Sequence, residues 1–443
     1  MPMAMHLTFR DISAIISEKE TTTVSVYGYR DRKFFVEDVS FDALAAAYGT
    51  PLYVYSRKAI LDDIRRIEQA FRGLPHLTYY AVKANANPAL LRLIAAEGLG
   101  ADVGSRGELW RALQEGFPPN RCTFSGVGKR DDEILYALEQ GILAFNVEST
   151  QEIEVINELA AKVNRRARIL LRVNLDIDAG GHAYVSTSLR HNKFGMPHAR
   201  ALEVLRHAAT LSNIDVGGVH SHIGSQITKP AVFEKAAEAI AGLVGDLRAA
   251  GLPIHDVDFG GGFGIQYHGF VHHRSLPAEH AEEAHLSTAE LLEPAVEVLR
   301  SLGCTVSIQP GRSIVAHGGV LLTRVLYRKE TAEKIFLIQD GAMNDLIRPA
   351  LYHSHHQIVP VELVGPPFET VDVVGPVCES GDFFAHDRRI QVLKRGDLMA
   401  LMCAGAYGFV QSSTYNARPR PAEVLVDGST HTVIRPRQSV EEL

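Results

Sequence analysis

Cysteine is scarce in this chain of 443 residues, and the few cysteines form no pattern. They are scattered without a CxxC pair, at Cys122, Cys304, Cys378 and Cys403. Disulfide-held secreted domains and structural zinc sites both depend on closely spaced cysteines, so this spacing argues against either class. Scattered free thiols are typical of a reducing compartment, and we therefore expect a cytoplasmic protein.

Long apolar runs and an excess of positive charge are also missing. No apolar stretch approaches the ~20 residues that a membrane-spanning helix requires, and the opening MPMAMHLTFRDIS has no basic stretch followed by an apolar core. We therefore expect neither a membrane span nor a signal peptide. The formal net charge of −7 argues against a nucleic-acid-binding surface. With 46% hydrophobic and 22% charged residues, the composition is that of a soluble globular protein.

The order of patterns along the chain predicts an α/β fold. Eight mostly apolar segments alternate with helical patterns, and we interpret them as strands at 77–82, 100–105, 122–126, 142–149, 168–174, 215–224, 255–261 and 304–310. Polar and glycine residues recur at the end of nearly every segment, where a (β/α)8 barrel carries its chemistry. We therefore predict a closed TIM-like barrel rather than an open doubly wound sheet.

A second domain is predicted because the chain is too long for one ordinary core. After about residue 312, β-branched residues and Gly/Pro turns replace the helical rhythm and predict an all-β domain. Residues 1–50 are too few to fold alone, so we expect them to join that domain. The predicted domains are a barrel over 51–312 and a β domain made of 1–50 together with 313–443.

A histidine-rich segment, 267–285, interrupts the alternation. Its histidines are His268, His272, His273, His280 and His285. Their spacing fits no compact ligand motif, so we interpret the segment as a solvated, variable loop and predict no metal site.

Lys83 is the first candidate for chemistry. It ends the apolar strand LTYYAV, and Asn85, Asn87 and Pro88 then break the strand and suit the start of a helix. A lysine held where a strand leaves a core is partly desolvated, so its pKa tends to fall and its amine can act as a Schiff-base nucleophile. Taken alone, the same lysine could simply extend to water.

Glycines and histidines follow two other predicted barrel strands. Gly260, Gly261 and Gly262 come directly after HDVDF. Their backbone N–H groups could close on a phosphate, although successive glycines also make tight turns. His220 and His222 share one face of a strand, with His222 nearer the barrel mouth. A histidine there can stack on an aromatic ring or be an ordinary core residue.

Two arginines could bind an anion. Arg312, in QPGR, is a fixed positive charge at the end of the last barrel strand, suited to a phosphate or a carboxylate. It could instead form a salt bridge between the two domains. Arg348 and Tyr352 are four residues apart, on one face if this stretch is helical.

Two motifs of the β domain carry further polar groups. In GPVCESGDFF, Cys378 offers a proton donor beside the carboxylate of Glu379, although a buried structural cysteine is the more ordinary interpretation. In GAYG, Tyr407 lies between glycines on a turn, where its ring and hydroxyl could point into a site.

Taken together, ten motifs in this order resemble the fold-type III pyridoxal-phosphate-dependent decarboxylases, and most closely the diaminopimelate decarboxylases. They are YYAVKAN, FSGVGK, FNVES, HNKFG, HSHIGSQ, GGG, PGRSIVA, MNDLIRPALY, GPVCESGDFF and GAYG. The resemblance covers nearly the whole chain. It implies an alanine racemase/ornithine decarboxylase-like architecture, pyridoxal 5'-phosphate as cofactor, and decarboxylation of meso-2,6-diaminopimelate to L-lysine and CO2 in lysine biosynthesis.

The resemblance also implies a role for each candidate residue. Lys83 would bond to the cofactor, His222 would stack on its ring, and the three glycines would hold its phosphate. Arg312, Arg348 and Tyr352 would bind the distal carboxylate of the substrate, Glu379 its distal amine, and Tyr407 both cofactor and substrate. Cys378 would protonate the carbanion left by CO2. Cys378 and Glu379 would reach the partner's site, which implies a homodimer with shared active sites.

Gln309 departs from the pattern of the family, which has a glutamate there facing the pyridine nitrogen of the cofactor. A neutral amide can hydrogen-bond that nitrogen but supplies no counter-charge. We therefore expect a less protonated ring and slower decarboxylation than in relatives with glutamate, or else a change of substrate.

Three alternatives follow from these residues. A related decarboxylase could act on D-lysine, D-ornithine or a siderophore precursor, although two arginines favour a substrate with a second carboxylate. A racemase would need a second base in place of Cys378. A non-catalytic homologue that binds or regulates is disfavoured because Lys83, Cys378 and Tyr407 are all present.

Overall fold

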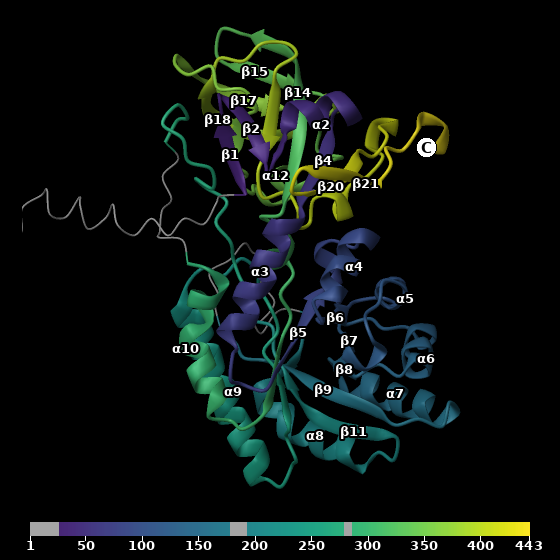
Figure 1. Ribbon diagram of the computed structural model, residues 1–443. Helices are drawn as coiled ribbons and strands as arrows, with labels where there is room; N and C mark the ends of the chain where they lie inside the picture. Colours follow the sequence, from purple (N-terminus) through teal and green to yellow (C-terminus); the bar gives the residue numbers. More distant parts are fainter. Residues whose placement is uncertain (1–25, 178–192, 279–285) are drawn as a thin grey trace, which may run out of the picture.

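The structure of the protein, a computed structural model, describes residues 26–177, 193–278 and 286–443. Figure 1 shows two bodies joined end to end, a barrel with an outer layer of helices and a β-rich domain. The candidate residues Lys83, Arg312 and Tyr407 lie in segments near the junction of the two bodies, so the fold of both bodies positions them.

The barrel is built from eight parallel strands. They are β5 (His76–Ala81), β6 (Gly100–Val103), β7 (Cys122–Phe124), β8 (Ala144–Val147), β9 (Ala167–Asn174), β11 (Ile214–His220), β12 (Asp256–Asp258) and β13 (Thr305–Ile308). Neighbours pair in the order β9-β11-β12-β13-β5-β6-β7-β8, and β8 pairs with β9 again, which closes the ring. The predicted closed barrel is confirmed.

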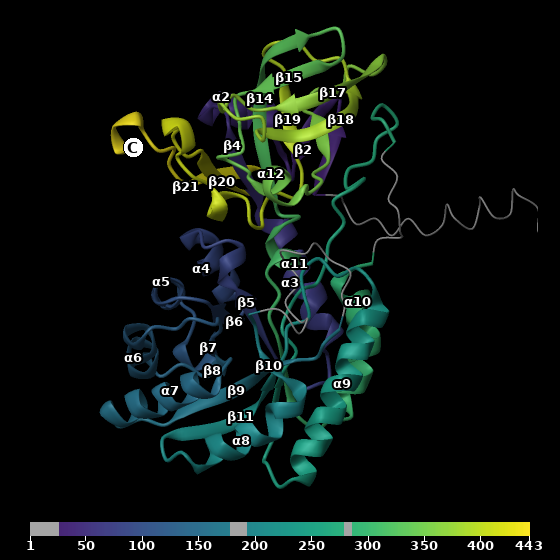
Figure 2. The ribbon, with the colours of Figure 1, turned by 180° about the vertical axis from the view of Figure 1, so that it is seen from behind.

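Helices between the strands form the outer layer, seen from behind in Figure 2. They are α3 (Arg57–Ala70), α4 (Pro88–Ala96), α5 (Arg106–Gln114), α6 (Asp131–Gln140), α7 (Thr150–Lys162), α8 (Ala201–Thr210), α9 (Pro230–Ala249) and α10 (Thr288–Arg300). In α7 the side chain of Ser149 accepts the N–H of Glu152, which satisfies a donor that the helix itself leaves open. Its buried residues, Ile153, Ile156 and Leu159, recur at helical spacing and pack on the strands.

The second sheet forms the core of the β domain. Its main path is β18-β17-β15-β14-β4-β20-β21, and β19 pairs with β14 and β16. The bounds are β4 (Leu52–Ser56), β14 (Gly319–Glu330), β15 (Ile335–Gln339), β16 (Ile358–Pro360), β17 (Phe368–Val374), β18 (Phe383–Gln391), β19 (Leu398–Leu401), β20 (Ala422–Asp427) and β21 (Thr430–Arg435). An all-β second domain was predicted, and the fold of barrel plus β domain is confirmed.

The described N-terminal residues pack against this sheet. Strands β1 (Tyr27–Arg30), β2 (Lys33–Val36) and β3 (Val39–Ser40) make a small sheet, followed by α2 (Phe41–Tyr48). The N–H of Phe34 donates to the carbonyl of Val361 at 2.8 Å. Strand β4, just inside the predicted barrel limit at 51, hydrogen-bonds with β14 and β20 of the second sheet instead. The limits at 51 and 312 stay a prediction.

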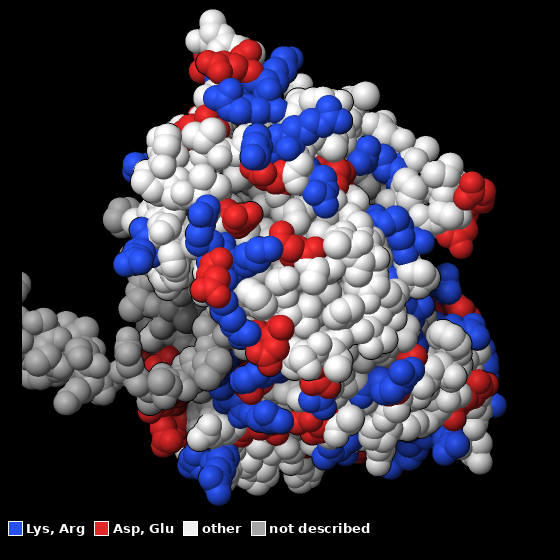
Figure 3. Space-filling view, turned by 45° about the horizontal axis from the view of Figure 1, so that its top comes forward, with Lys and Arg blue, Asp and Glu red and all other residues white. Residues whose placement is uncertain are grey.

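The surface carries charges of both signs. On the face in Figure 3, Lys and Arg alternate with Asp and Glu around an uncharged central area. Within the described ranges, no helix combines the length and the apolar character of a membrane span. In that same part of the chain, no cluster of His, Cys, Asp and Glu has the arrangement of a metal site.

Candidate active site

Lys83 stands on a turn of the barrel that contacts the β domain. It lies in η1 (Val82–Ala84), directly after β5. Asn85, the residue that follows η1, donates through Nδ2 to the carbonyl of Gly405 at 3.0 Å. The N–H of Tyr407 donates to the carbonyl of Ala84 at 2.8 Å. These bonds place the predicted GAYG turn beside Lys83.

The side chain of Lys83 is exposed in the single chain, so the expectation that a buried strand end would desolvate it is wrong here. The physical reason is its position on η1, beyond the last hydrogen-bonded residue of β5, at the open end of the barrel. Its positive charge nevertheless acts on buried neighbours. Burial raises the pKa of Asp102 on β6, and the charge of Lys83 opposes that rise. Lys83 thus lies near enough to this buried carboxyl group for its charge to favour the ionised form.

Gly260, Gly261 and Gly262 form a tight cradle at the end of β12. A Cβ added to Gly261 would stand 2.3 Å from the carbonyl oxygen of Gln309, and one added to Gly262 would stand 2.3 Å from that of Gly224. Gly260 and Gly262 also have positive φ angles of 71° and 95°, which side chains disfavour. The sequence GGG is therefore required by close backbone packing, and the N–H groups of Gly260 and Gly261 donate to Asp258 and His222.

His222 is attached to this cradle. The N–H of Gly261 donates to Nδ1 of His222 at 3.1 Å. Burial, and then the positive charges of Lys83 and Arg172, lower the pKa of His222 well below its usual range. The ring is therefore neutral at pH 7, with its proton on Nε2, and it lies beside the glycines. His220 is buried deeper in the barrel at 1% exposure.

Gln309 makes a contact that the sequence did not predict. Its Nε2 donates to Oδ2 of Asp258 at 2.7 Å, and both side chains are buried. Burial raises the pKa of Asp258 to about 7, against the hydrogen bonds that it accepts from Gly260, Asn146 and Gln309. A carboxyl group whose pKa lies near 7 therefore accepts a hydrogen bond from the amide of Gln309.

Arg312 and Arg348 both contact the side chain of Tyr267. The guanidinium carbon of Arg348 lies 4.8 Å from the ring centroid of Tyr267, and that of Arg312 lies 5.9 Å from it. Nη1 of Arg312 also donates to the hydroxyl of Tyr267 at 2.6 Å. The ring of Tyr407 lies 5.0 Å from the guanidinium carbon of Arg312, which brings a fourth residue to the cluster.

The two arginines are buried cations without an acidic partner among the described residues. Arg348 is 4% exposed and donates to Nε2 of His356 and to the hydroxyl of Ser354. Arg312 is 9% exposed and donates to hydroxyl groups of Tyr267 and Ser225. Burial lowers the pKa of Arg348, and the charge of Arg312 lowers it further. Two buried like charges favour an anion between them.

Tyr352 also belongs to this region. It closes the short helix α12 (Arg348–Tyr352), so it lies one turn after Arg348, as predicted from the sequence. Together with Tyr267 and Tyr407, it raises the pKa of Arg312 against the effect of burial.

Cys378 and Glu379 are not brought to this cluster by the single chain. They lie on the exposed turn between β17 and β18. The N–H of Cys378 donates to Oδ1 of Asn416 at 3.0 Å. In the described part of the chain, no hydrogen bond or ion pair joins either side chain to Lys83 or to the arginines. The interpretation of Cys378 as a buried structural cysteine is wrong, because Cys378 is exposed on this turn.

The histidine-rich segment contributes a residue that sequence reasoning missed. Up to residue 278 it is described, and Tyr267 and Val271 are buried at 8% and 7% exposure, so this part is not a solvated loop. His268 stacks on His355 with ring centroids 3.6 Å apart. His280 and His285 lie outside the described residues. The buried apolar residues between the histidines were the available signal.

Comparisons with known proteins agree with this geometry. Residues 57–316 match the family described as "Pyridoxal-dependent decarboxylase, pyridoxal binding domain". A diaminopimelate decarboxylase of Pseudomonas aeruginosa is 44% identical over 420 residues, 95% of this chain and 98% of the relative.

Two solved structures are similar over the same length. One is a diaminopimelate decarboxylase of M. jannaschii in complex with L-lysine, with TM-score 0.87, 34% identity and coverage of 94% and 96% of the two chains. The other is a diaminopimelate decarboxylase of Helicobacter pylori, also in complex with L-lysine. Its TM-score is 0.84 and its sequence identity 38%, with coverage of 91% of this chain and 98% of that chain. Sequence, fold and the cluster at the barrel mouth agree, and the chain belongs to the pyridoxal-dependent decarboxylases.

Proposed function

We propose that this protein decarboxylates meso-2,6-diaminopimelate to L-lysine and CO2 with pyridoxal 5'-phosphate as cofactor. The observation that carries the proposal is the pair of buried arginines, Arg312 and Arg348, which have no acidic partner among the described residues. A substrate with a second carboxylate supplies the missing negative charge. A substrate without one would leave both cations uncompensated.

The residues at the barrel mouth fit the cofactor. Gly260, Gly261 and Gly262 would hold the phosphate at the end of β12, where added side chains would collide with backbone carbonyls of neighbouring strands and loops. His222 presents a neutral ring beside the cradle, suited to stacking on another ring. Lys83 supplies the amine that anchors the cofactor. When bound, the cofactor supplies a conjugated ring that accepts the electron pair left as CO2 departs.

The arginine pair would orient the substrate. Holding the distal carboxylate between Arg312 and Arg348 fixes which end of the substrate faces Lys83. Tyr352 and Tyr407 complete the wall around this carboxylate. These assignments rest on the position of each side chain around the cluster.

Protonation of the product would come from a second copy of the chain. Cys378 and Glu379 are exposed and lie apart from the cluster of their own chain. We therefore propose a homodimer in which Cys378 donates the proton and Glu379 binds the distal amine in the partner's site. We further propose a cytoplasmic enzyme, which is supported by four free cysteines.

Mixing two inactive variants tests the shared site. Lys83→Ala and Cys378→Ala chains are each expected to be inactive as homodimers. Random reassociation of equal amounts makes half of the dimers mixed, and one of the two sites in each mixed dimer keeps both residues. About a quarter of wild-type activity should return on mixing. No return, with exchange of subunits confirmed by native mass spectrometry, would place both residues in the same chain's site.

The substrate is tested by measuring CO2 release from the cofactor-loaded protein. We would offer meso-diaminopimelate, D-lysine, L-lysine and L-ornithine in parallel. Release is expected from diaminopimelate at least about 10²-fold faster than from the others, since losing one partner of a buried charge pair costs about 3–5 kcal/mol. Faster release from a mono-carboxylate would overturn the proposed substrate.

A further inference from the structure

The loop after the glycine cradle carries a residue to which no role is assigned above. Tyr267 lies three residues beyond the glycine of GGGFG at position 264, in the segment that follows β12. It contacts Arg312 through its hydroxyl and Arg348 through its ring face. No other described side chain contacts both guanidinium groups by hydrogen bond or ring stacking.

The two contacts are chemically different. The hydroxyl of Tyr267 accepts from Nη1 of Arg312 at 2.6 Å, so its own proton remains to be donated elsewhere. The ring face attracts the Arg348 guanidinium 4.8 Å from its centroid. One side chain therefore sets the separation of two cations that would otherwise repel each other.

A third contact fixes the orientation of Arg348. Nδ1 of His356 bonds the carbonyl of Met402 at 2.8 Å, and a carbonyl only accepts, so Nδ1 carries the proton. Nε2 therefore accepts from Nη1 of Arg348 at 2.7 Å. The His356 ring packs edge-on against Tyr267, with centroids 5.2 Å apart and an angle of 78°. Tyr267 thus supports Arg348 directly and through its neighbour.

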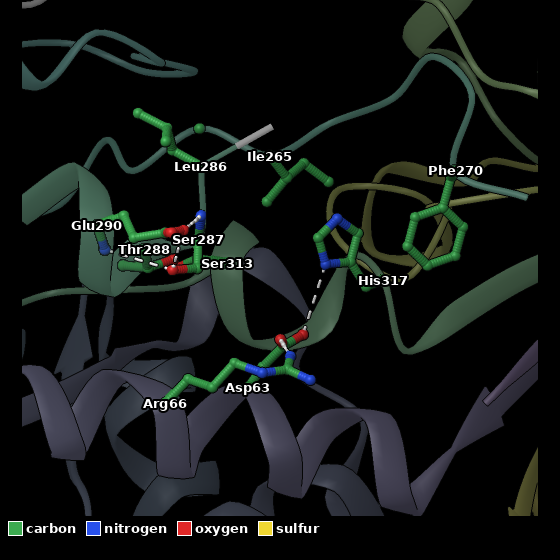
Figure 4. Close-up of a pocket in the computed structure, with 11 residues that line it drawn as sticks. Asp63, Arg66, Ile265, Phe270, Leu286, Ser287, Thr288, Glu290, Ser313 and His317 are labelled. Atoms are coloured by element: carbon green, nitrogen blue, oxygen red, sulfur yellow. Dashed lines mark hydrogen bonds and ion pairs between the residues drawn. The ribbon is translucent and has the colours of Figure 1, made fainter. Parts of the chain in front are cut away.

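The loop that carries Tyr267 is held at several points. Nε2 of Gln226 donates to the carbonyl of Ile265 at 2.6 Å, and Gln357 bonds both the N–H and the carbonyl of Val271. Figure 4 shows Phe270 stacked on His317, whose ring also faces Asp63 of helix α3. His317 follows closely on α11 (Arg312–Val315), so the same short stretch that begins with Arg312 holds the loop of Tyr267.

We propose that Tyr267 is a specificity-determining positioning residue, which holds Arg312 and Arg348 at the spacing that one distal carboxylate can bridge. The inference rests on the proposed function. It assigns Tyr267 to selectivity for the carboxylate rather than to the decarboxylation step, since in the described part of the chain no hydrogen bond or ring contact joins it to Lys83 or His222.

Binding of two diamines to the cofactor-loaded protein tests this role, with the cofactor absorbance as readout. L-lysine keeps the carboxylate that would lie between the arginines, and pentane-1,5-diamine is the same chain without it. In the wild type, L-lysine should bind more tightly. In Tyr267→Phe, the Kd of L-lysine should rise about tenfold, because Arg312 loses its acceptor, and that of the diamine should stay within about twofold.

Two further variants complete the design. Tyr48→Phe removes a hydroxyl that bonds Nδ1 of His431 at 2.6 Å, far along the chain from the arginines, and should change neither Kd. In an Arg312→Lys background, Tyr267→Phe should raise the Kd of L-lysine by less than about twofold further, because both changes break the same contact. Steady-state kinetics of Tyr267→Phe should show a raised KM for diaminopimelate and a nearly unchanged kcat.

The outcomes separate the two proposals. If the wild type binds L-lysine no more tightly than the diamine, the distal carboxylate site, and with it the proposed function, is wrong. If the wild type prefers L-lysine and Tyr267→Phe keeps that preference, only the role of Tyr267 is wrong. Equal weakening of both diamines would also overturn the role, since it would mean a general structural effect.

Discussion

Replacing Arg348 with methionine is expected to stabilise the fold while it lowers kcat/KM for diaminopimelate by about 10³-fold. Arg348 and Arg312 are buried like charges with no carboxylate beside them among the described residues. Methionine fills a similar length without charge. The free energy of unfolding should therefore rise by up to about 3 kcal/mol, after subtracting about 1 kcal/mol for the lost hydrogen bonds to His356 and Ser354.

Arg172→Met is the matched control for stability. Arg172 is buried to a similar degree, at 6% exposure, but it forms an ion pair with the buried Glu148 at 2.8 Å. Its removal leaves that carboxylate without a counter-charge, so the fold should lose about 3–5 kcal/mol. Urea unfolding of the cofactor-free proteins measures both changes. If Arg348→Met destabilises the fold as much as Arg172→Met does, the arginine pair is not electrostatically strained.

The activity change follows from the same geometry. Without Arg348 the distal carboxylate would be held by Arg312 alone, and the substrate would be less well oriented. A loss of about 4 kcal/mol, within the range for a broken buried charge pair, corresponds to about 10³-fold in kcat/KM. Pentane-1,5-diamine, which lacks the carboxylate, should bind the variant as tightly as it binds the wild type. If kcat/KM falls by less than about tenfold, the role of Arg348 is contradicted.

The barrel was predictable from the sequence because its signals are local. The strand segments are mostly apolar, and the helices between them are marked by their own periodicity, so the order alone gives the topology. Lys83, the three glycines and Arg312 could be placed at the mouth for the same reason, since the ends of parallel strands meet at one edge. That rule needs only the position of each residue within its own strand.

Contacts made across the sequence could not be predicted. Tyr267 and Arg312 meet because a loop folds back onto the start of α11, and nothing local to either residue encodes that. Asp258 and Gln309 are 51 residues apart and share a hydrogen bond only because β12 and β13 are neighbours in the barrel. Lys83 was expected to be desolvated, but it is exposed. Exposure at the mouth depends on the surrounding loops rather than on the strand, so the strand pattern could not predict it.

Gln309→Glu is expected to make the fold more sensitive to alkaline pH, and this result follows from the contact with Asp258. The substitution replaces the Nε2 donor, 2.7 Å from Oδ2 of Asp258, with a second carboxyl oxygen. Two buried carboxyl groups at that distance share one proton, and the pair holds it above the pKa of about 7 of Asp258 in the wild type. The variant should therefore keep one proton bound at pH 7.

The direction of the pH effect follows from linkage. In the unfolded chain both groups ionise near pH 4, so above that pH the folded protein binds more protons, and the free energy of unfolding falls as pH rises. For Asp258 in the wild type this fall ends near pH 7. In Gln309→Glu it should continue to about pH 9 and cost a further 2–3 kcal/mol or so, since each unit of pH per proton is about 1.4 kcal/mol.

Urea unfolding of the cofactor-free proteins between pH 5 and pH 9 measures this slope. Asp345 also has a pKa raised to about 7 by burial, so the comparison is made between variants that all retain it. Asp258→Asn removes the wild-type contribution, and Asp258→Asn/Gln309→Glu restores a donor beside the new carboxyl group, so the slope above pH 7 should disappear in the double variant. A steep slope that persists in the double variant would assign the effect to residue 309 alone.

The same pair limits what a glutamate can add to catalysis. Asp258 is about half ionised at pH 7 beside Gln309, and the Glu–Asp pair would carry one charge, so the gain in negative charge is about half a unit. We therefore expect Gln309→Glu to raise kcat by only about threefold and to shift the absorbance of the bound cofactor. No gain and no spectral shift would contradict the idea that the missing charge slows this enzyme. A gain above about 100-fold would contradict the sharing of one proton, because it would require two negative charges where Asp258 and residue 309 meet.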